Sequence, residues 1–370
     1  MNFKNIEMNP LNKIRELDQS IWLDLLDREI MNSGKLQSLI ENDDLRGLTS
    51  NPSIFEKAIS GSSDYDADIS RISQNESDNS TIFFDMAIAD IQRAADLFKP
   101  VYDKTGGKDG FVSLEVSPYL ALDTDGTIQQ ARELWKKVDR KNVMIKIPGT
   151  KQGLPAIREC LREGININVT LLFGLPRYRE ITEAFMGGLE DRLAEGNAIE
   201  GVSSVASFFL SRIDVMVDPM LDEKGLGNLK GKVAIASAKI AYQIYLEMIA
   251  SDRFKKLEAK GAQTQRVLFA STSTKDPAFS DVLYVENLIG KDTINTLPME
   301  TIDAFRDHGK AAATLTENIE EANKTMDELK NKGIDIDKIT QKLEDEGIEK
   351  FNQAYEKLIK SIDDQKRKKS

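Results

Sequence analysis

The sequence has very little of two residues on which many enzymes depend. Its 370 residues include one cysteine, Cys160, and one histidine, His308. A single cysteine excludes an internal disulfide and a cysteine-ligated zinc site, and a single histidine leaves the familiar histidine-based metal sites and triads incomplete. Any catalytic chemistry must therefore depend on Lys, Asp, Glu, Thr, Ser and Asn side chains, and we expect neither a metal nor another cofactor.

Basic residues are also in deficit. The chain has 50 Lys and Arg against 61 Asp and Glu, which gives a formal net charge of −11. An acidic chain repels nucleic acid phosphates and anionic lipid, so we expect neither a nucleic acid nor a membrane as a partner. An anionic ligand would need a local cluster of basic side chains.

Long apolar runs are absent as well. The N-terminal stretch lacks the apolar core of a secretory signal, and no run of about 18 apolar residues occurs that could span a membrane. Together with the single cysteine, these absences predict a soluble, cytoplasmic protein. The sequence leaves the oligomeric state open, and we expect a monomer or a homodimer.

Short apolar or β-branched runs alternate with longer helical patterns along residues 1–300, which is typical of βα units and a parallel sheet. The candidate strands are residues 21–26, 47–50, 111–116, 142–147, 165–172, 203–209, 266–271 and 293–297. Helical patterns occupy residues 28–41, 80–99, 127–138, 153–162, 175–193, 232–250 and 278–288. An open, doubly wound sheet is an alternative, but eight βα units over about 300 residues favour a closed, TIM-type (β/α)₈ barrel.

Residues 301–370 have a different character. They show no strand pattern, but an apolar stripe at helical spacing includes Ile339, Leu343, Ile348, Phe351, Tyr355, Leu358 and Ile362. We expect helices that pack on the outside of the barrel within the same domain and end in a solvated tail, residues 363–370. A coiled-coil partner helix is the alternative, although Gly333 and Gly347 interrupt its pattern.

Polar side chains occur inside strands that should be apolar on both faces. In residues 142–147, Lys146 has the opposite parity to the apolar residues, so its side chain is predicted to project into the barrel. The same parity places Asn166, Asn168 and Thr170 inside, whereas Leu171 is predicted to face the helices. This pattern indicates a polar, chemically active lumen.

Two acidic residues are predicted to join this set. Asp24 and Glu115 have the inward parity in the first and third strands, and Asn51 ends the second strand before a proline that can begin a helix.

Lys146 has two interpretations. It is either a structural cation paired with Glu115 or Asp24, or a nucleophile whose neutral amine, favoured by burial, adds to a ketone carbonyl. The sequence shows no motif of a flavin, nicotinamide or metal site.

Several strings at these positions resemble the transaldolase family of class I, Schiff-base aldolase barrels. They run in order from IWLDLLDREI through GLTSNPSIFEKAI, SLEVSPYLALDT, NVMIKIPGTKQGLPAI, GININVTLLF and SVASFFLSRID to VLFASTSTKDPAFSDVLYVENLIG and TINTLP. The resemblance covers almost the whole chain. The length, the Lys-Ile-Pro string and the C-terminal helices are similar to the longer bacterial subfamily.

The resemblance implies transfer of a dihydroxyacetone unit in the non-oxidative pentose phosphate pathway. The donor would be sedoheptulose 7-phosphate or fructose 6-phosphate, and the acceptor glyceraldehyde 3-phosphate or erythrose 4-phosphate. Lys146 matches the family's Schiff-base lysine and Asp24 its acid/base aspartate. Glu115 and Thr170 match the pair that holds the catalytic water. The substrate-contacting positions are matched by Asn51, Asn168 and Ser207.

The family binds phosphate with an arginine after the sixth strand and a Ser-x-Arg string after the seventh. Arg212 matches the first, and its guanidinium suits phosphate oxygens. Ser271 matches the serine of the second, but Ser273 stands where the arginine is expected. Lys275 is then the candidate for the missing charge.

Two other functions compete with this interpretation. A lyase of the fructose-6-phosphate aldolase type shares the lysine and releases free dihydroxyacetone, but such lyases are much shorter and use a tyrosine where Asp24 stands here. A catalytically silent barrel that binds sugar phosphates or other proteins would have lost the inward polar set, which is complete in this sequence.

Overall fold

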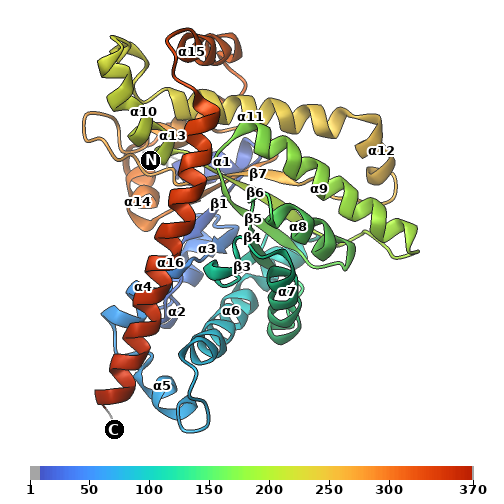
Figure 1. Ribbon diagram of the computed structural model, residues 1–370, viewed down its shortest axis with the longest axis vertical. Coiled ribbons are helices and arrows are strands. Elements are labelled where there is room, and N and C mark those ends of the chain that lie inside the picture. Colours follow the sequence, from blue (N-terminus) through green and yellow to red (C-terminus); the bar gives the residue numbers. More distant parts are fainter. Residues whose placement is uncertain (1–8, 369–370) are drawn as a thin grey trace, which may run out of the picture.

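A computed structural model describes residues 9–368 of the chain. Its eight strands are all parallel, pair in sequence order and close into a barrel when β8 pairs with β1 (Figure 1). The strands are β1 Gln19–Asp24, β2 Gly47–Thr49, β3 Phe111–Glu115, β4 Val143–Pro148, β5 Ile167–Leu172, β6 Ser204–Phe209, β7 Arg266–Ala270 and β8 Thr293–Leu297. The predicted (β/α)₈ barrel is confirmed.

The strand bounds lie close to the predicted ones, and the largest shift is at β1. This strand begins at Gln19, two residues before its apolar run. The buried Gln19 amide donates hydrogen bonds to the Leu288 carbonyl, at 2.7 Å, and to Thr293 Oγ1, at 2.9 Å. These partners in and before β8 allow a polar side chain to extend the strand into the interior.

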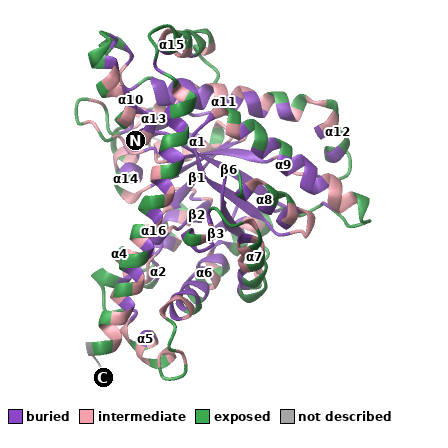
Figure 2. Ribbon diagram, in the orientation of Figure 1, coloured by how far each residue is buried: buried purple, intermediate pink, exposed green. Residues whose placement is uncertain are grey.

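Helices surround the barrel, and most of the predicted ones are present (Figure 2). Those between the strands are α2 Arg28–Asn32, α3 Lys35–Asn42, α4 Pro52–Gly61, α5 Asp66–Ile72, α6 Asn79–Lys104, α7 Thr124–Val138, α8 Gly153–Arg162, α9 Leu175–Ala194, α10 Ser211–Glu223, α11 Val233–Ala250, α12 Asp252–Glu258 and α13 Leu283–Asn287. A further helix, α1 Pro10–Glu16, precedes β1, and the 3₁₀ turn η1 Pro118–Leu120 follows β3.

Two helix predictions need correction. The single helix predicted over residues 28–41 is divided into α2 and α3, because Gly34 adopts a left-handed conformation with φ +75° between them. The helix predicted over residues 278–288 is only the short α13. One helix, α11, is apolar and long enough to cross a membrane by composition, but most of it is buried against α9, α10 and α15, as in a core helix.

The chain after β8 forms α14 Met299–His308, α15 Ile319–Asn331 and the long α16 Ile336–Lys368. Gly347 lies inside α16 instead of interrupting it. The tail predicted to be solvated from residue 363 is helical to Lys368, and the Gln365 amide donates to the Ile59 carbonyl of α4 at 3.1 Å. Residues 369–370 lie outside the described part of the chain.

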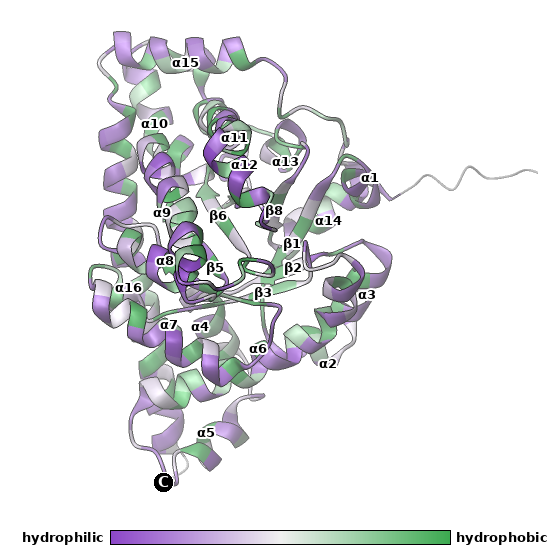
Figure 3. Ribbon diagram, turned by 90° about the vertical axis from the view of Figure 1, so that its right-hand side faces the viewer, coloured by the Kyte–Doolittle hydropathy of each residue, from purple (hydrophilic) through white to green (hydrophobic). Residues whose placement is uncertain are grey.

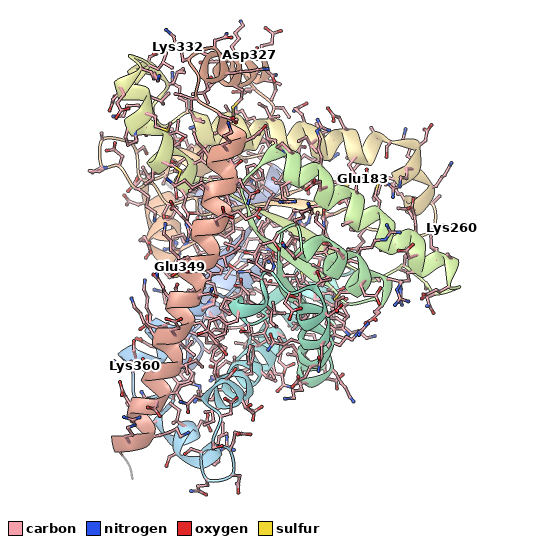
Figure 4. The ribbon with its side chains drawn as sticks, viewed as in Figure 1. Glu183, Lys260, Asp327, Lys332, Glu349 and Lys360 are labelled. Carbon is pink, nitrogen blue, oxygen red and sulfur yellow. The ribbon has the colours of Figure 1, made fainter. Side chains whose placement is uncertain are left out.

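The long helix α16 crosses the face of the barrel at which the strands end. It contacts α4 and η1, which follow β2 and β3, and also the end of β5 and α10, which follows β6. Figure 1 shows it in front of the barrel, and in Figure 3 it forms one edge of the molecule, with hydrophilic and hydrophobic residues alternating along it. Glu349 and Lys360 are exposed on its outer side (Figure 4).

Candidate active site

A cavity of about 230 Å³ lies at the carboxyl ends of the strands, beside α16. This is the end at which TIM-barrel enzymes place their active sites. The predicted site residues that line the cavity are Asp24, Asn51, Lys146, Thr170, Ser207, Arg212, Ser271 and Lys275. The other two, Glu115 and Asn168, are buried directly behind this lining and contact it.

Lys146 and Glu115 form a buried ion pair. They are register partners on β4 and β3, and Lys146 Nζ lies 3.3 Å from Glu115 Oε2. The amine also donates a hydrogen bond to the Ser50 carbonyl at 2.9 Å. Burial raises the pKa of Glu115 above its usual range, although the charge of Lys146 opposes the shift. A carboxyl with a raised pKa holds a proton more readily than a free carboxyl, which suits a proton donor.

Asp24 supplies a second carboxyl at the end of β1. The Thr49 hydroxyl donates to Asp24 Oδ1 at 2.8 Å and lies 2.9 Å from the Thr296 hydroxyl, so neighbouring strands fix the carboxylate. Burial raises the pKa of Asp24, which the positive charge of Lys146 partly offsets. This group is therefore suited to proton transfer at the cavity wall.

A hydrogen-bonded chain passes through Asn168, the register partner of Lys146 on β5. The Ser207 hydroxyl donates to Asn168 Oδ1 at 2.7 Å, and Asn168 Nδ2 donates to Ser113 Oγ at 3.0 Å. Thr170 differs, because its fully buried hydroxyl has no hydrogen-bond partner among residues 9–368. Its hydroxyl is free to hold a reactant or a water molecule in the cavity.

Asn166 does not join the polar set predicted for the lumen. Its amide donates to the carbonyls of Lys141 and Val143, at 2.9 and 3.1 Å, and its oxygen accepts from the Ser203 amide at 2.8 Å. These backbone partners lie where β5 begins, at the opposite end of the barrel from the cavity. The side chain therefore has a structural role.

The backbone departs from a regular strand immediately after Thr170. Leu171 has φ +53°, and the register of β5 with β6 shifts between Val169 and Leu172. Leu171, which is predicted to face the helices, does not line the cavity. Its side chain reaches the mouth of the barrel, where it meets α16 at Gly347.

Basic side chains gather at the end of the cavity near β6 and β7. Arg212 lies in the first turn of α10, with its Cζ 5.6 Å from the centre of the Phe209 ring. Burial lowers the pKa of Arg212, against the opposing charges of Asp24 and Glu346. Its buried Nη1 has no hydrogen-bond partner within the described residues, so this nitrogen can take an anionic ligand.

The loop after β7 adds a serine and a lysine. Ser271 has φ +55°, and its hydroxyl lies 2.8 Å from that of Ser211. Lys275 is exposed, and its Nζ donates to Ser273 Oγ at 2.5 Å. The lysine thus reaches the position at which the family's arginine was expected.

Asn51 both caps a helix and lines the cavity. Its side-chain oxygen accepts a hydrogen bond from the Ile54 amide at 3.1 Å and caps the N-terminus of α4. The residue also lines the cavity, so its side-chain amide group can donate to a ligand while the oxygen holds the helix.

Several lining residues were not identified from the sequence. They are Thr49, Ser53, Thr272, Thr296, Pro298, Glu300 and Phe351. The inward parity of Thr49 opposite Leu48 is a signal that could have found it. Phe351 had no such signal, because it belongs to an apolar stripe that indicates packing. Among residues 9–368, no cluster of three or more His, Cys, Asp or Glu could hold a metal ion.

The closed barrel, with a buried lysine and two carboxyls at the carboxyl ends of its strands, has the layout of a TIM-barrel enzyme with covalent and acid/base chemistry. The sequence from residue 21 to residue 362 matches the family model described as transaldolase/fructose-6-phosphate aldolase. The chain belongs to this family, which confirms the resemblance and the prediction of an enzyme of this type.

Curated relatives match almost end to end. A protein named Transaldolase from Trichodesmium erythraeum (strain IMS101) is 48% identical over 97% of this chain and 98% of its own length. Transaldolase 2 from Nostoc sp. (strain PCC 7120 / SAG 25.82 / UTEX 2576) is 48% identical over 96% and 97%. Transaldolase from Thiobacillus denitrificans (strain ATCC 25259 / T1) is 42% identical over 96% and 100%.

Proposed function

We propose that the protein is a transaldolase that carries a dihydroxyacetone unit on Lys146. The donor is a ketose phosphate, sedoheptulose 7-phosphate or fructose 6-phosphate, and the acceptor is glyceraldehyde 3-phosphate or erythrose 4-phosphate. The observation that carries this proposal is the Lys146 amine, which lines the cavity beside a carboxyl with a raised pKa. The family and its relatives named Transaldolase support it.

In the first step Glu115 takes a proton from the Lys146 ammonium, and the neutral amine attacks the ketose carbonyl carbon. The resulting carbinolamine must lose its hydroxyl as water, which requires a proton donor close to the nitrogen. Glu115, at 3.3 Å from Nζ, is suited to supply that proton. The unpartnered Thr170 hydroxyl can hold the departing water, and the same two groups act in reverse during hydrolysis.

Cleavage follows once the iminium ion has formed. Asp24 takes the proton of the C4 hydroxyl, the C3–C4 bond breaks, and its electrons enter the iminium system to give an enamine. The aldose leaves, and an acceptor aldehyde takes its place. The enamine carbon then attacks this aldehyde, and Asp24 returns the proton to the new hydroxyl.

Asn51, Asn168 and Ser207 would hold the hydroxyl groups of the three-carbon unit. Arg212, Ser271 and Lys275 would bind the phosphate at the other end of the cavity. These two cations provide the local attraction that a chain with a net charge of −11 needs for an anionic substrate. The mechanism uses side chains alone. We also propose a cytoplasmic location.

Borohydride reduction in the presence of fructose 6-phosphate tests the proposal. Reduction of the imine should leave a stable adduct, and peptide mass analysis should place it on Lys146. The Lys146→Ala variant should form no adduct, whereas the control Lys141→Ala, which changes an exposed lysine before β4, should form it normally. No adduct, or an adduct on another residue, would contradict the proposal.

A second assay separates transfer from simple cleavage. A transaldolase should pass the three-carbon unit to erythrose 4-phosphate and release little dihydroxyacetone when no acceptor is present. Release that is as fast without an acceptor as transfer is with one would assign the protein to the lyase branch of its family.

A further inference from the structure

At Gly347, α16 lies against the end of β5 and beside Arg212 of α10. A Cβ atom at Gly347 would lie 2.9 Å from Leu171 Cδ2 and 3.8 Å from Arg212 Nη1. The glycine therefore allows the helix backbone to lie directly on the end of β5 and beside Arg212.

Two turns later, α16 is held on the opposite side of the barrel mouth. The Tyr355 hydroxyl lies 2.6 Å from Ser80 Oγ, and its ring packs edge-on against Phe83 and Tyr119, at 5.8 and 5.4 Å between ring centres. Tyr355 also lines a small cavity with Glu115. At Tyr355 the helix is therefore fixed beside the elements that follow β2 and β3.

Phe351 lies between these two anchors. It is four residues from Gly347 and four from Tyr355, so it is on the same face of the helix, about 6 Å along the axis from each. Its side chain is 5% exposed and lines the cavity that contains Lys146 and Asp24. The ring therefore lies in the wall of the cavity between the two contacts of α16.

The cavity remains accessible on the side that α16 does not cross. Its exposed lining residues, Lys275 and Glu300, follow β7 and β8. Sugars can therefore enter from that side, while α16, with Phe351 in the cavity wall, covers the side of β2 to β6.

We propose that the Phe351 side chain keeps water from the three-carbon intermediate on Lys146. The intermediate then reacts with an acceptor aldose instead of with water. This inference rests on the proposed function. Loss to water needs a proton on the enamine carbon, addition of water to C2 and cleavage of the bond between C2 and Nζ. The products are dihydroxyacetone and the free amine. An apolar ring at the barrel mouth offers no hydrogen bond to a water molecule. It therefore disfavours addition of water to C2 of the intermediate.

The test compares two rates in purified full-length protein. One is release of dihydroxyacetone from fructose 6-phosphate without an acceptor, and the other is transfer to erythrose 4-phosphate. Phe351→Ala should raise the ratio of release to transfer by about tenfold or more. Phe351→Leu retains most of the apolar volume and should restore a ratio close to that of the original protein.

The matched control is Leu358→Ala. Leu358 is a fully buried residue of the same helix that does not line the cavity, so its removal loosens α16 without opening the site. An unchanged ratio in Phe351→Ala, or an equal rise in Leu358→Ala, would overturn the inference. If Phe351→Ala does not fold, Phe351→Val takes its place and the same outcomes decide.

Borohydride trapping on Lys146 in the original protein distinguishes a failure of the proposed function from a failure of the role assigned to Phe351. Absence of the Lys146 adduct contradicts the proposed function itself. An adduct together with an unchanged release ratio in the Phe351 variants contradicts only the role of Phe351.

Discussion

Lys146 Nζ lies 3.3 Å from Glu115 Oε2, and each side chain is only 5% exposed. An ion pair buried to this degree gains little net stability compared with apolar residues, but removal of one partner leaves the other charge buried and unpaired. Lys146, the proposed nucleophile, is therefore linked to the stability of the fold through Glu115.

We expect Lys146→Met to lower the free energy of unfolding by about 3 kcal/mol at pH 8. The loss should be smaller at about pH 5, because burial already raises the pKa of Glu115 and the carboxyl can then take up a proton. Adding Glu115→Gln should recover part of the stability at pH 8, since a neutral amide replaces the unpaired charge. Urea unfolding at both pH values measures these changes. Equal losses at both pH values, with no recovery in the double variant, would argue against the linkage.

Asp24→Asn should separate imine formation from bond cleavage. The amide cannot accept the hydroxyl proton, so we expect turnover to fall by about 10²- to 10⁴-fold while borohydride still traps an adduct on Lys146. The control is Asp27→Asn, because Asp27 caps α2 through a 2.7 Å bond from the Ile30 amide and asparagine caps equally well. That variant should keep normal turnover. Normal cleavage in Asp24→Asn would remove the residue from the acid/base role.

Arg212→Ala should weaken the binding of phosphorylated sugars more than Lys275→Ala. Loss of hydrogen bonds to a charged group costs about 1.5 to 3 kcal/mol, or about 10- to 100-fold in KM. Lys275 is exposed, so solvent screens its charge and the effect should be a few-fold.

A sugar that lacks the phosphate is the control for these two variants. With fructose, which has no phosphate, neither substitution should change kcat/KM appreciably. Lys230→Ala should leave KM unchanged for both sugars, because Lys230 pairs with Asp222 outside the catalytic cavity. An equal loss of kcat/KM with fructose and fructose 6-phosphate would contradict the assignment of Arg212 to the phosphate.

The barrel could be predicted from the sequence because buried parallel strands are nearly continuous apolar runs, and parity within them identifies inward side chains. This reasoning placed Lys146 correctly in the lumen. It gave no indication of the backbone irregularity at Leu171, because parity assumes a regular strand and this residue has a left-handed conformation. Gln19 shows a second limit, since only the partners in and before β8 make its burial favourable.

The part of the site contributed by α16 could not be predicted from periodicity. An apolar stripe indicates that a helix packs against something, but it does not indicate which surface. Phe351 has the same sequence signature as Leu358, although Phe351 lines the cavity and Leu358 does not. Gly347 interrupts the apolar pattern in the sequence, and its close approach to Leu171 gives a packing reason for a glycine in the middle of the helix.

The last prediction concerns a buried carboxyl near Arg212. Asp214 lies two residues after Arg212 and accepts hydrogen bonds from the Ala234 amide and the Tyr284 hydroxyl, each at 2.8 Å. Burial raises the pKa of Asp214 to about 7 despite these bonds, and the nearby Asp218 adds to the rise. The folded state therefore holds a proton that the unfolded state releases at lower pH.

Because the pKa of Asp214 is higher in the folded state, its contribution to stability is complete below about pH 4 and is lost as the pH rises to about 7. Asp214→Asn keeps the shape of the side chain and removes its titration. The difference in unfolding free energy between the two proteins should thus move in favour of the variant by about 2 to 3 kcal/mol between pH 5 and pH 8. The control Asp222→Asn changes an exposed carboxylate of the same helix and should show no comparable movement. A difference that stays constant across this range for Asp214→Asn would show that the carboxyl is ionised in the folded protein throughout, held so by its two hydrogen bonds.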